Sequence, residues 1–414
     1  MPRKRKPHVL FLMPFLPSPP VDGGKKRVHT ILRLLSDRYD FTVLSFINKQ
    51  EQVWDVPALK KFCKAVYPVL LSPAPVPAAE ELFLPEIVKS CYSPAMAASL
   101  QTLLRESPPD LVHIEFVQMA YYRRWIRDVP VVFTEHDISN ISFFRSYFRE
   151  MTGWRRWGRV VEWMRLVKYQ MDACRGLDGV VTLTPPDTEK LRSFLPDLRV
   201  QCIYTGVDLK HFSPGRQNGT SPREAEAHLV YVGHYMHYPN EDAILYFCRE
   251  IFPLIEKLCP IVHLWVVGSG VTKAVEDLQK NPRIHVTGTV KDVKPYLEKA
   301  DVFVAPLRLG EGIKGKILEA WAMRLPVVTT PVGARGLQAR PEEHYLLGRN
   351  PREFAEKTAR LIFDRVLRDR LIRNARKLVE TTYDWDRLAD QVDDFYKEIM
   401  ENYRRKKALP AQSL

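Results

Sequence analysis

Short apolar runs separated by polar loops and amphipathic stretches set the pattern of the first half of the chain. The run at 8–13 is followed by a polar loop and then by apolar residues at helical spacing over 28–35. Similar apolar runs occupy 41–46, 111–114, 129–134 and 179–183. Strands that are apolar on both faces and alternate with helices are typical of a parallel sheet covered on both sides.

The same rhythm restarts in the second half, after a stretch at 212–227 that is rich in Gly, Pro, Ser and polar residues. Such a composition is typical of a linker. Beyond it we expect strands at 229–233, 262–268, 284–287, 302–306 and 326–329, and helices at 243–258, 293–299 and 316–323. Amphipathic helices are expected at 351–381 and 385–403.

Two domains are the expected organisation, because 414 residues exceed the length over which one hydrophobic core keeps growing. We predict an α/β fold built from two doubly wound domains in tandem. The first domain is expected to cover 1–206 and the second 228–380, with a linker at 207–227 between them. A last helix and basic tail, 381–414, are expected to cross back onto the first domain.

Composition narrows the class of protein. Hydrophobic residues make up 45% and charged residues 27% of the chain, which excludes disorder of the whole chain. The six cysteines form no C-x-x-C pair and have no nearby histidines at metal-ligand spacing, so we expect reduced core residues in a cytoplasmic protein. No apolar run is long enough to span a membrane, and the broken run behind the basic N-terminus predicts a buried strand rather than a signal peptide.

The net charge of +13 indicates an anionic partner, which would be nucleic acid, a membrane surface or a phosphorylated substrate. Part of the excess lies where arginines alternate with aromatic residues, over 143–148 and 154–165. A helix of this kind is suited to an anionic membrane surface, here the inner face of the membrane, with its aromatic side chains in the lipid. The alternative is a helix that packs its aromatic residues on its own domain.

The strongest chemical signal lies between 305 and 323. A buried strand ends, a glycine-rich loop with Lys314 and Lys316 follows, and a helix begins near Lys316. Glycines such as Gly312 and Gly315 let a ligand approach the backbone N–H groups at a helix N-terminus. Because those N–H groups favour negative charge, this segment predicts a phosphate site.

Two acids bracket the same loop, with Glu311 in the loop and Glu319 in the first turns of the helix. Carboxylates accept hydrogen bonds from paired hydroxyls, so one acid is suited to a sugar and the other to a ribose. Acids at the start of a helix are more often solvated groups that interact with the helix dipole. The strand, glycines and lysines around this pair favour the functional interpretation.

His136 follows the strand predicted at 129–134, and open α/β sheets bind ligands at the carboxyl ends of their strands. This position favours a functional histidine over one that is buried in the core. His113, in the strand at 111–114, is more simply explained as an alternating strand position. The segment 268–270 lacks the third glycine of a dinucleotide-binding motif, so we interpret it as a tight turn.

Taken in order, several segments resemble glycosyltransferase family 4, whose members carry a Glu-x7-Glu motif in this strand, loop and helix context. The segments that carry the resemblance are 22–24, 204–214, 231–233, 286–293, 318–323 and 326–330. Within the family, 238–240 (Tyr-Pro-Asn) and 312–316 (Gly-Ile-Lys-Gly-Lys) look like bacterial sugar transferases of exopolysaccharide clusters. The resemblance covers nearly the whole chain.

The resemblance implies a GT-B fold, in which two Rossmann-like domains face a central cleft. It also implies an enzyme that moves a sugar from a nucleotide diphosphate sugar to a glycan or lipid-linked acceptor, with retention of the anomeric configuration. Family members usually act without a bound metal, so no metal or other cofactor is expected. The implied setting is the synthesis of cell-surface or exported polysaccharide.

Particular residues take roles from the same resemblance. Glu311 would contact the donor sugar, and Glu319 would bind the ribose of the donor nucleotide. Gly23 and Gly24 would let the first domain approach the donor phosphates across the cleft. His136 would lie beside the sugar that is transferred, at the end of a strand in the first domain.

The chain departs from the family pattern in two places. Family members often carry an Arg and a Lys after the first strand of the second domain, where they hold the diphosphate, and residues 233–239 contain neither. Lys314 and Lys316 are the expected substitutes, because a departing diphosphate needs positive charge nearby. Thr205 stands where the common Asn-Gly-Val-Asp segment has its Asn.

Two other functions fit parts of the sequence. A nucleotide-sugar epimerase of the same fold would use a similar donor site, although the succession of family 4 segments along the chain favours a transferase. A protein that binds nucleotide sugars or nucleic acid without turnover would account for the basic net charge. Of the partners considered, nucleic acid is the one we expect least.

Overall fold

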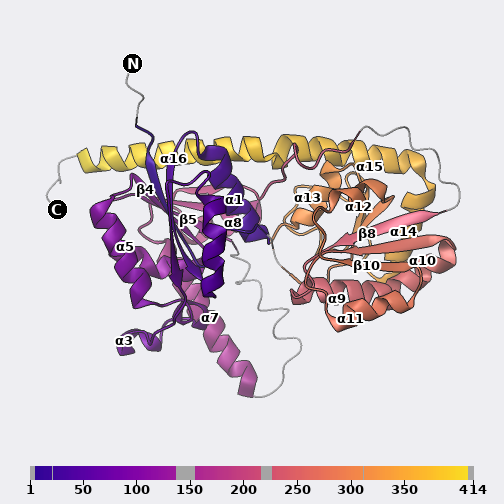
Figure 1. Cartoon of the computed structure of the whole chain (residues 1–414), viewed down its shortest axis with the longest axis horizontal. Helices are drawn as coiled ribbons and strands as arrows, with labels where there is room; N and C mark the ends of the chain where they lie inside the picture. Colours follow the sequence, from indigo (N-terminus) through magenta and orange to yellow (C-terminus); the bar gives the residue numbers. More distant parts are fainter. Residues whose placement is uncertain (1–4, 21, 137–153, 216–225, 311, 409–414) are drawn as a thin grey trace. The chain divides into compact units, whose positions relative to one another are not determined.

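The computed structural model describes residues 5–20, 22–136, 154–215, 226–310 and 312–408. The chain divides into two compact units: unit 1 combines Met1–Tyr204 with Leu388–Leu414, and unit 2 is Thr205–Arg387. Figure 1 labels several elements of each unit. Of the segment predicted as a linker, 207–227, Val207 forms a β-bridge with Asp384 and Ala227 begins a strand of unit 2.

The described residues of unit 1 form a seven-stranded parallel sheet in the order β3-β2-β1-β4-β5-β6-β7. Its strands are β1 (His8–Met13), β2 (Asp40–Ile47), β3 (Ala65–Leu70), β4 (Leu111–Glu115), β5 (Val131–Glu135), β6 (Gly179–Thr182) and β7 (Val200–Cys202). The strand order reverses between β1 and β4, as in a doubly wound fold. Every residue of β1, β4, β5 and β6 is buried, because both faces of the sheet are covered.

Helices cover the two faces of this sheet. Figure 1 shows α1 (Gly23–Leu35) and α5 (Pro94–Glu106) on opposite sides of the strands. Successive strand residues point to opposite faces, and Val112 and Ile114 of β4 share one core cluster with Leu100 of α5. The other helices of unit 1 are α2 (Val56–Leu59), α3 (Ala78–Glu81), α4 (Glu86–Lys89), α7 (Trp154–Cys174), α8 (Pro185–Phe194), η1 (Gln50–Asp55) and η2 (Val117–Trp125).

The described residues of unit 2 form a six-stranded parallel sheet in the order β10-β9-β8-β11-β12-β13. Its strands are β8 (Ala227–Val232), β9 (Val262–Val267), β10 (Ile284–Gly288), β11 (Val302–Ala305), β12 (Val327–Thr329) and β13 (Leu346–Leu347). Its helices are α9 (Tyr238–Tyr246), η4 (Phe247–Ile251), α10 (Phe252–Leu258), α11 (Lys273–Glu276), η5 (Asp277–Lys280), α12 (Lys294–Lys299), α13 (Gly315–Ala322), α14 (Pro351–Phe363), α15 (Arg365–Leu378) and η6 (Val379–Tyr383). The prediction of two doubly wound parallel α/β domains is confirmed.

The segment predicted to face a membrane is described only in part. Residues 143–148 lie outside the described residues, and 154–165 fall within α7. Val161 and Met164 of this helix are exposed. In the part of the chain that the structure describes, we find no helix with both the length and the apolar character needed to cross a bilayer.

The last helix, α16 (Trp385–Ala408), starts in unit 2 and belongs to unit 1 from Leu388 onward. The apolar stripe predicted for this helix is buried and consists of Leu388, Val392, Phe395, Tyr396 and Ile399. A hydrophobic stripe at helical spacing is what allows a helix to pack along a domain. The residues that complete unit 1 therefore follow unit 2 in the sequence.

A buried carboxylate on α16 joins this helix to the first part of unit 1. Asp393 accepts hydrogen bonds from Arg38 Nη1 at 2.6 Å, from Tyr39 OH at 2.7 Å and from Lys397 Nζ at 2.9 Å. Burial alone would raise the pKa of Asp393, but the hydrogen bonds from Lys397, Tyr39 and Arg38 lower it. The ionised carboxylate therefore stabilises the folded state.

We expect Asp393→Asn to lower the free energy of unfolding by about 1.5–3 kcal/mol at neutral pH, since hydrogen bonds to a charged group are lost. Because the folded-state pKa lies below the unfolded value, the difference from the parent should be complete at neutral pH. It should shrink below about pH 4, as the carboxylate of the parent protonates. Urea unfolding at several pH values measures both effects.

Asp390→Asn is the matched control for this change. Asp390 also pairs with Arg38, at 2.7 Å, but its side chain is 60% exposed, whereas that of Asp393 is 4% exposed. Exposed ion pairs contribute about 0–1 kcal/mol. Equal losses of stability in the two variants would show that the buried carboxylate has no special part in holding α16.

Candidate functional site

The loop at 306–314 follows β11 at the point where the strand order of unit 2 reverses. From β8 the sheet runs through β9 to β10 on one side, and through β11 to β12 and β13 on the other. Ligands of open α/β sheets bind outside the carboxyl ends of the strands at such a reversal. The glycine-rich loop singled out in the sequence therefore lies where this architecture places a ligand.

Two glycines of this loop adopt backbone angles that other residues avoid. Gly310 has a φ of +107° and Gly312 has a φ of +69°. Lys314, the residue that precedes α13, donates from Nζ to the carbonyl oxygen of Gly312 at 2.7 Å. Gly315 begins the helix, and nothing lies within 4 Å of a side-chain carbon built on it. Glu311 lies outside the described residues.

Lys316 joins this segment to the end of β8. Its ammonium donates to Asn240 Oδ1 at 2.8 Å and to Tyr231 OH at 3.1 Å, and it lies 4.3 Å from the centre of the Tyr231 ring. Asn240 in turn donates to the carbonyl oxygen of His234 at 2.9 Å. The two segments noted together in the sequence, 238–240 and 312–316, thus meet in the structure.

Glu319 lies in α13 and is 8% exposed, among apolar neighbours on the same helix. The structure therefore places Gly312, Lys314, Gly315, Lys316 and Glu319 in one turn and helix at the switch point of unit 2. Gly23, Gly24 and His136, the other predicted site residues, belong to unit 1.

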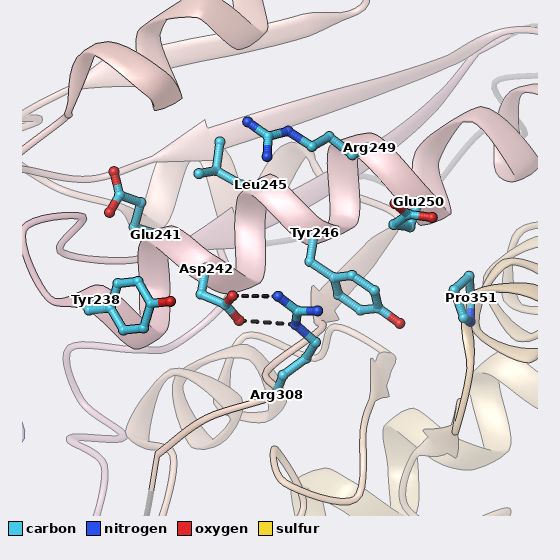
Figure 2. A pocket seen from close by; sticks show the side chains of 9 residues that line it. All are labelled: Tyr238, Glu241, Asp242, Leu245, Tyr246, Arg249, Glu250, Arg308 and Pro351. Carbon is cyan, nitrogen blue, oxygen red and sulfur yellow. Dashed lines mark hydrogen bonds and ion pairs between the residues drawn. The ribbon is translucent and has the colours of Figure 1, made fainter. Parts of the chain in front are cut away.

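The arginine just before the loop is held by a carboxylate. Figure 2 shows Arg308 reaching Asp242 of α9, with one bond from Nε to Oδ2 at 3.1 Å and a second from Nη2 to Oδ1. The guanidinium also lies 4.3 Å from the centre of the Tyr246 ring. These residues line a pocket of about 500 Å³. Bidentate pairing of this kind fixes the start of the loop on α9.

The glycines at 268–270 form a packing turn at the end of β9. Gly268 has a φ of +137°, and a side-chain carbon built on it would lie 1.8 Å from the carbonyl oxygen of Gly233. The neighbouring Ser269 Oγ lies 2.9 Å from His234 Nδ1. Only glycine permits this approach of two backbones, which supports the tight turn expected from the sequence.

In unit 1, His136 follows β5 and its Nε2 lies 2.5 Å from Oε2 of Glu115. Glu115 ends β4 and is fully buried. Phe116 stacks on the imidazole with ring centres 3.7 Å apart and an angle of 3° between the planes. A side-chain carbon built on Gly24 would lie 2.7 Å from the same Phe116 ring. Gly24 and His136 therefore share one neighbour, whereas a side-chain carbon on Gly23 would meet nothing within 4 Å.

His113 is buried in the same strand as Glu115, two residues before it. Its Nε2 lies 2.7 Å from Thr134 Oγ1, and its Nδ1 bonds to the hydroxyl of Tyr396 on α16. Burial lowers the pKa of His113 to about 4, so the ring is neutral at neutral pH. The structure thus gives His113 the role of a satisfied core residue.

Two buried charged residues near His113 and His136, Arg27 and Glu115, were not identified from the sequence. Arg27 of α1 is buried and donates to the carbonyl oxygens of Ile203 at 3.2 Å and Tyr204 at 2.7 Å. Burial alone would raise the pKa of Glu115, but His113, the hydrogen bond from His136 and the charge of Arg27 lower it.

Among the described residues, no three His, Cys, Asp or Glu side chains are grouped as metal ligands would be.

Two family descriptions match the chain, one in each half. The first, Glycosyltransferase Family 4, matches residues 21–211, and the second, Glycosyl transferases group 1, matches residues 226–364. The chain belongs to glycosyltransferase family 4. The resemblance seen in the sequence is therefore confirmed, and the matched ranges contain the predicted site residues of both units.

One curated relative is also described as a glycosyltransferase. The chain is 32% identical to the capsular polysaccharide biosynthesis glycosyltransferase CapM of Staphylococcus aureus over 149 residues. This match covers 33% of the chain and 39% of CapM, so it spans well under half of that relative's length.

Solved structures show that the fold of this family 4 member is GT-B. Sucrose-phosphate synthase from Thermosynechococcus elongatus superposes with a TM-score of 0.73 at 17% identity, over 96% of the chain and 100% of that protein. HepE from Anabaena, solved with UDP and glucose, superposes with a TM-score of 0.68 at 14% identity, over 95% of the chain and 100% of that protein.

The backbone angles of the 306–314 loop generate a test within this family 4 member. We expect Gly312→Ala to lower the free energy of unfolding of the ligand-free protein by about 1–2 kcal/mol, the cost of a side chain in the left-handed region. Gly315→Ala should be neutral or stabilising by up to about 1 kcal/mol, since alanine is the better helix residue. Urea unfolding compares the two. A Gly315→Ala variant that loses as much stability as Gly312→Ala would contradict the backbone argument.

Proposed function

We propose that this family 4 member transfers a sugar from a nucleotide diphosphate sugar to a glycan or lipid-linked acceptor, with retention of configuration and without a metal. The observation that carries the proposal is the meeting of the glycine turn, α13 and Lys316 at the switch point of unit 2. The description of CapM as a capsular polysaccharide enzyme and of HepE as a complex with UDP and glucose support this chemistry. Synthesis of cell-surface or exported polysaccharide is the setting we infer.

Negative charge that develops on a departing diphosphate needs positive charge and N–H donors that are already in position. Lys316 is held at the end of β8 by Asn240 and Tyr231, near the place where family members often carry an Arg and a Lys. Gly312, Gly315 and the first N–H groups of α13 add donors for the phosphates. Lys314 is the second cation of this segment.

The two acids have different roles in the proposal. Glu319 binds the ribose hydroxyls of the donor, which the ground state and the transition state share. Glu311 is assigned the role of stabilising the positive charge that the sugar acquires as the bond to the diphosphate breaks. In unit 1, His136 acts at the transferred sugar, and Gly23 and Gly24 permit a close approach of the backbone to the donor phosphates.

An anionic membrane surface is part of the same proposal. The net charge of +13 supports attachment at the inner, cytoplasmic face of a membrane, where a lipid-linked acceptor would be held. The basic end of α16, with Arg404, Arg405, Lys406 and Lys407 exposed, adds to that charge. The aromatic and arginine residues of 154–165 are the other element of this interpretation.

The roles proposed for the two acids predict different kinetic effects when each acid is replaced. Glu311→Gln should lower kcat by roughly ten-fold to a thousand-fold while donor binding stays near normal, since an electrostatic contribution acts mainly on the transition state. Glu319→Gln should raise the donor KM more than it lowers kcat, because it removes binding common to both states. Steady-state kinetics, or donor hydrolysis where the acceptor is unknown, measures both. Parental turnover by Glu311→Gln would remove the main support for a transferase.

The diphosphate contact is tested by binding. A thermal-shift panel of UDP-, GDP- and ADP-sugars identifies the donor, because a ligand that binds the folded state raises the melting temperature. Lys316→Met should then weaken binding of the matching nucleoside diphosphate by about 1–3 kcal/mol, measured by calorimetry. Lys273→Met is the control, since that exposed lysine is paired with Glu276 and Asp277. Unchanged affinity in Lys316→Met would assign the phosphates to another cation.

A further inference from the structure

The carboxylate of Glu115 occupies an unusual position for a charged group. It is fully buried at the end of β4, a strand in which His113 is the only other polar residue. Its Oε2 atom lies 2.5 Å from Nε2 of His136, whereas its Oε1 atom lies 3.3 Å from Nε2 of His113 without forming a hydrogen bond in the described part of the chain. Burying a carboxylate costs several kcal/mol, so an apolar residue would serve packing better.

The next residue, Phe116, has a strained backbone, and its ring contacts the imidazole of His136. Phe116 has a φ of +70° and a ψ of 141°, a region that is close to glycine-only. Such a conformation costs about 1–3 kcal/mol and persists only where the surroundings impose it. Its result is the parallel stack of the Phe116 ring on His136, so the imidazole is fixed from its face as well as its edge.

The hydrogen bond determines which ring nitrogen carries the proton. An ionised carboxylate only accepts hydrogen bonds, so the nitrogen that faces Glu115 is an N–H donor. In the neutral ring the other nitrogen, Nδ1, then carries a lone pair and accepts. No described residue donates to Nδ1, and the imidazole is 14% exposed. The ring thus offers one acceptor atom to a ligand.

We propose that Glu115 is a positioning residue, which holds His136 in the Nε2–H tautomer so that Nδ1 accepts a hydrogen bond from a hydroxyl of the transferred sugar. The choice of the sugar as ligand rests on the proposed function, while the orientation of the ring rests on the contacts of unit 1 alone. Glu115 acts through His136 and does not itself contact the sugar.

The surroundings of Glu115 support this role. Arg27 is buried in α1 and its charge favours the ionised carboxylate. His113 bonds to Thr134 and Tyr396, and its Nε2 faces the Oε1 atom of Glu115 at 3.3 Å, so it does not compete with His136 for the Oε2 atom. The only hydrogen bond that the Glu115 side chain makes within the described residues is therefore directed to the histidine at the end of the neighbouring strand.

The test combines nuclear magnetic resonance with kinetics on the full chain. With ¹⁵N-labelled histidine, the parent should show a downfield, slowly exchanging proton on Nε2 of His136 and an unprotonated Nδ1, assigned by its loss in His136→Asn. Glu115→Gln should weaken or remove this proton signal. It should also lower kcat by about ten-fold to a hundred-fold, the effect of a small misplacement, with donor affinity changed less than about two-fold.

Two controls separate positioning from stability. Glu398→Gln makes the same chemical change at an exposed pair with Arg199 and should leave both the proton signal and kcat unchanged. Tyr396→Phe removes a buried hydroxyl from His113 and should lower the melting temperature while the His136 signal persists. Loss of that signal in Tyr396→Phe would mean that general loosening of the core, and not Glu115, controls the ring.

Other results overturn the proposal directly. They are parental kcat in Glu115→Gln, protonation of both ring nitrogens of His136 at the assay pH, and a proton on Nδ1 in the parent. If the parent binds no nucleotide sugar, the proposed function fails, but the resonance experiment still decides whether Glu115 orients His136. If Glu115→Gln does not fold, the state of the ring in the parent and in Glu115→Asp, whose shorter carboxylate should lose the bond, decides the matter.

Discussion

A parallel strand covered by helices on both faces leaves a polar side chain two possible environments. It lies inside the core, where it needs a partner, or at the carboxyl end of the strand, where it is able to meet a ligand. Unit 1 uses both environments on one face of its sheet. His113 and Thr134 bond to each other within the core. Glu115, at the end of β4, bonds to His136, which follows β5. Because helices cover both faces of the sheet, polar residues that meet a ligand are concentrated at the carboxyl ends of the strands.

Unit 2 meets the same constraint by a different route. At its switch point, the polar groups that meet come from the end of β8, from helix α9 and from the start of helix α13. Lys316 and Asn240 are 76 positions apart in the sequence and are joined because β8 and β11 are neighbours in the sheet. A cation carried on α13 is thereby fixed beside the end of β8, although the segment that directly follows β8 contains no lysine or arginine.

Sequence patterns predicted the strands whose residues are nearly all apolar, since burial of both faces leaves a clear signal. They did not predict β3, which contains Pro68 and has exposed positions, or β7 and β13, which have three and two residues. Glu115 was missed, although a carboxylate at the end of an apolar strand was a readable signal. Arg27 was missed because it follows Lys25 and Lys26, so the local pattern suggests a solvated face. The pairing of Lys316 with Asn240 depends on tertiary structure and has no local signal.

The residues of unit 1 come partly before and partly after unit 2 in the sequence. This affects the order in which the two units are able to fold during synthesis. The hydroxyl that completes the bonding of His113 belongs to Tyr396, 283 positions later. When the ribosome has released the strands of unit 1, the helix that covers them does not yet exist, and all of unit 2 is made before it appears. Domains generally fold as units while they emerge, with the N-terminal one first. Here the unit encoded second is the first that has all its residues, and the unit encoded first must wait, with part of its core open to solvent and to chaperones, until translation of α16 is finished.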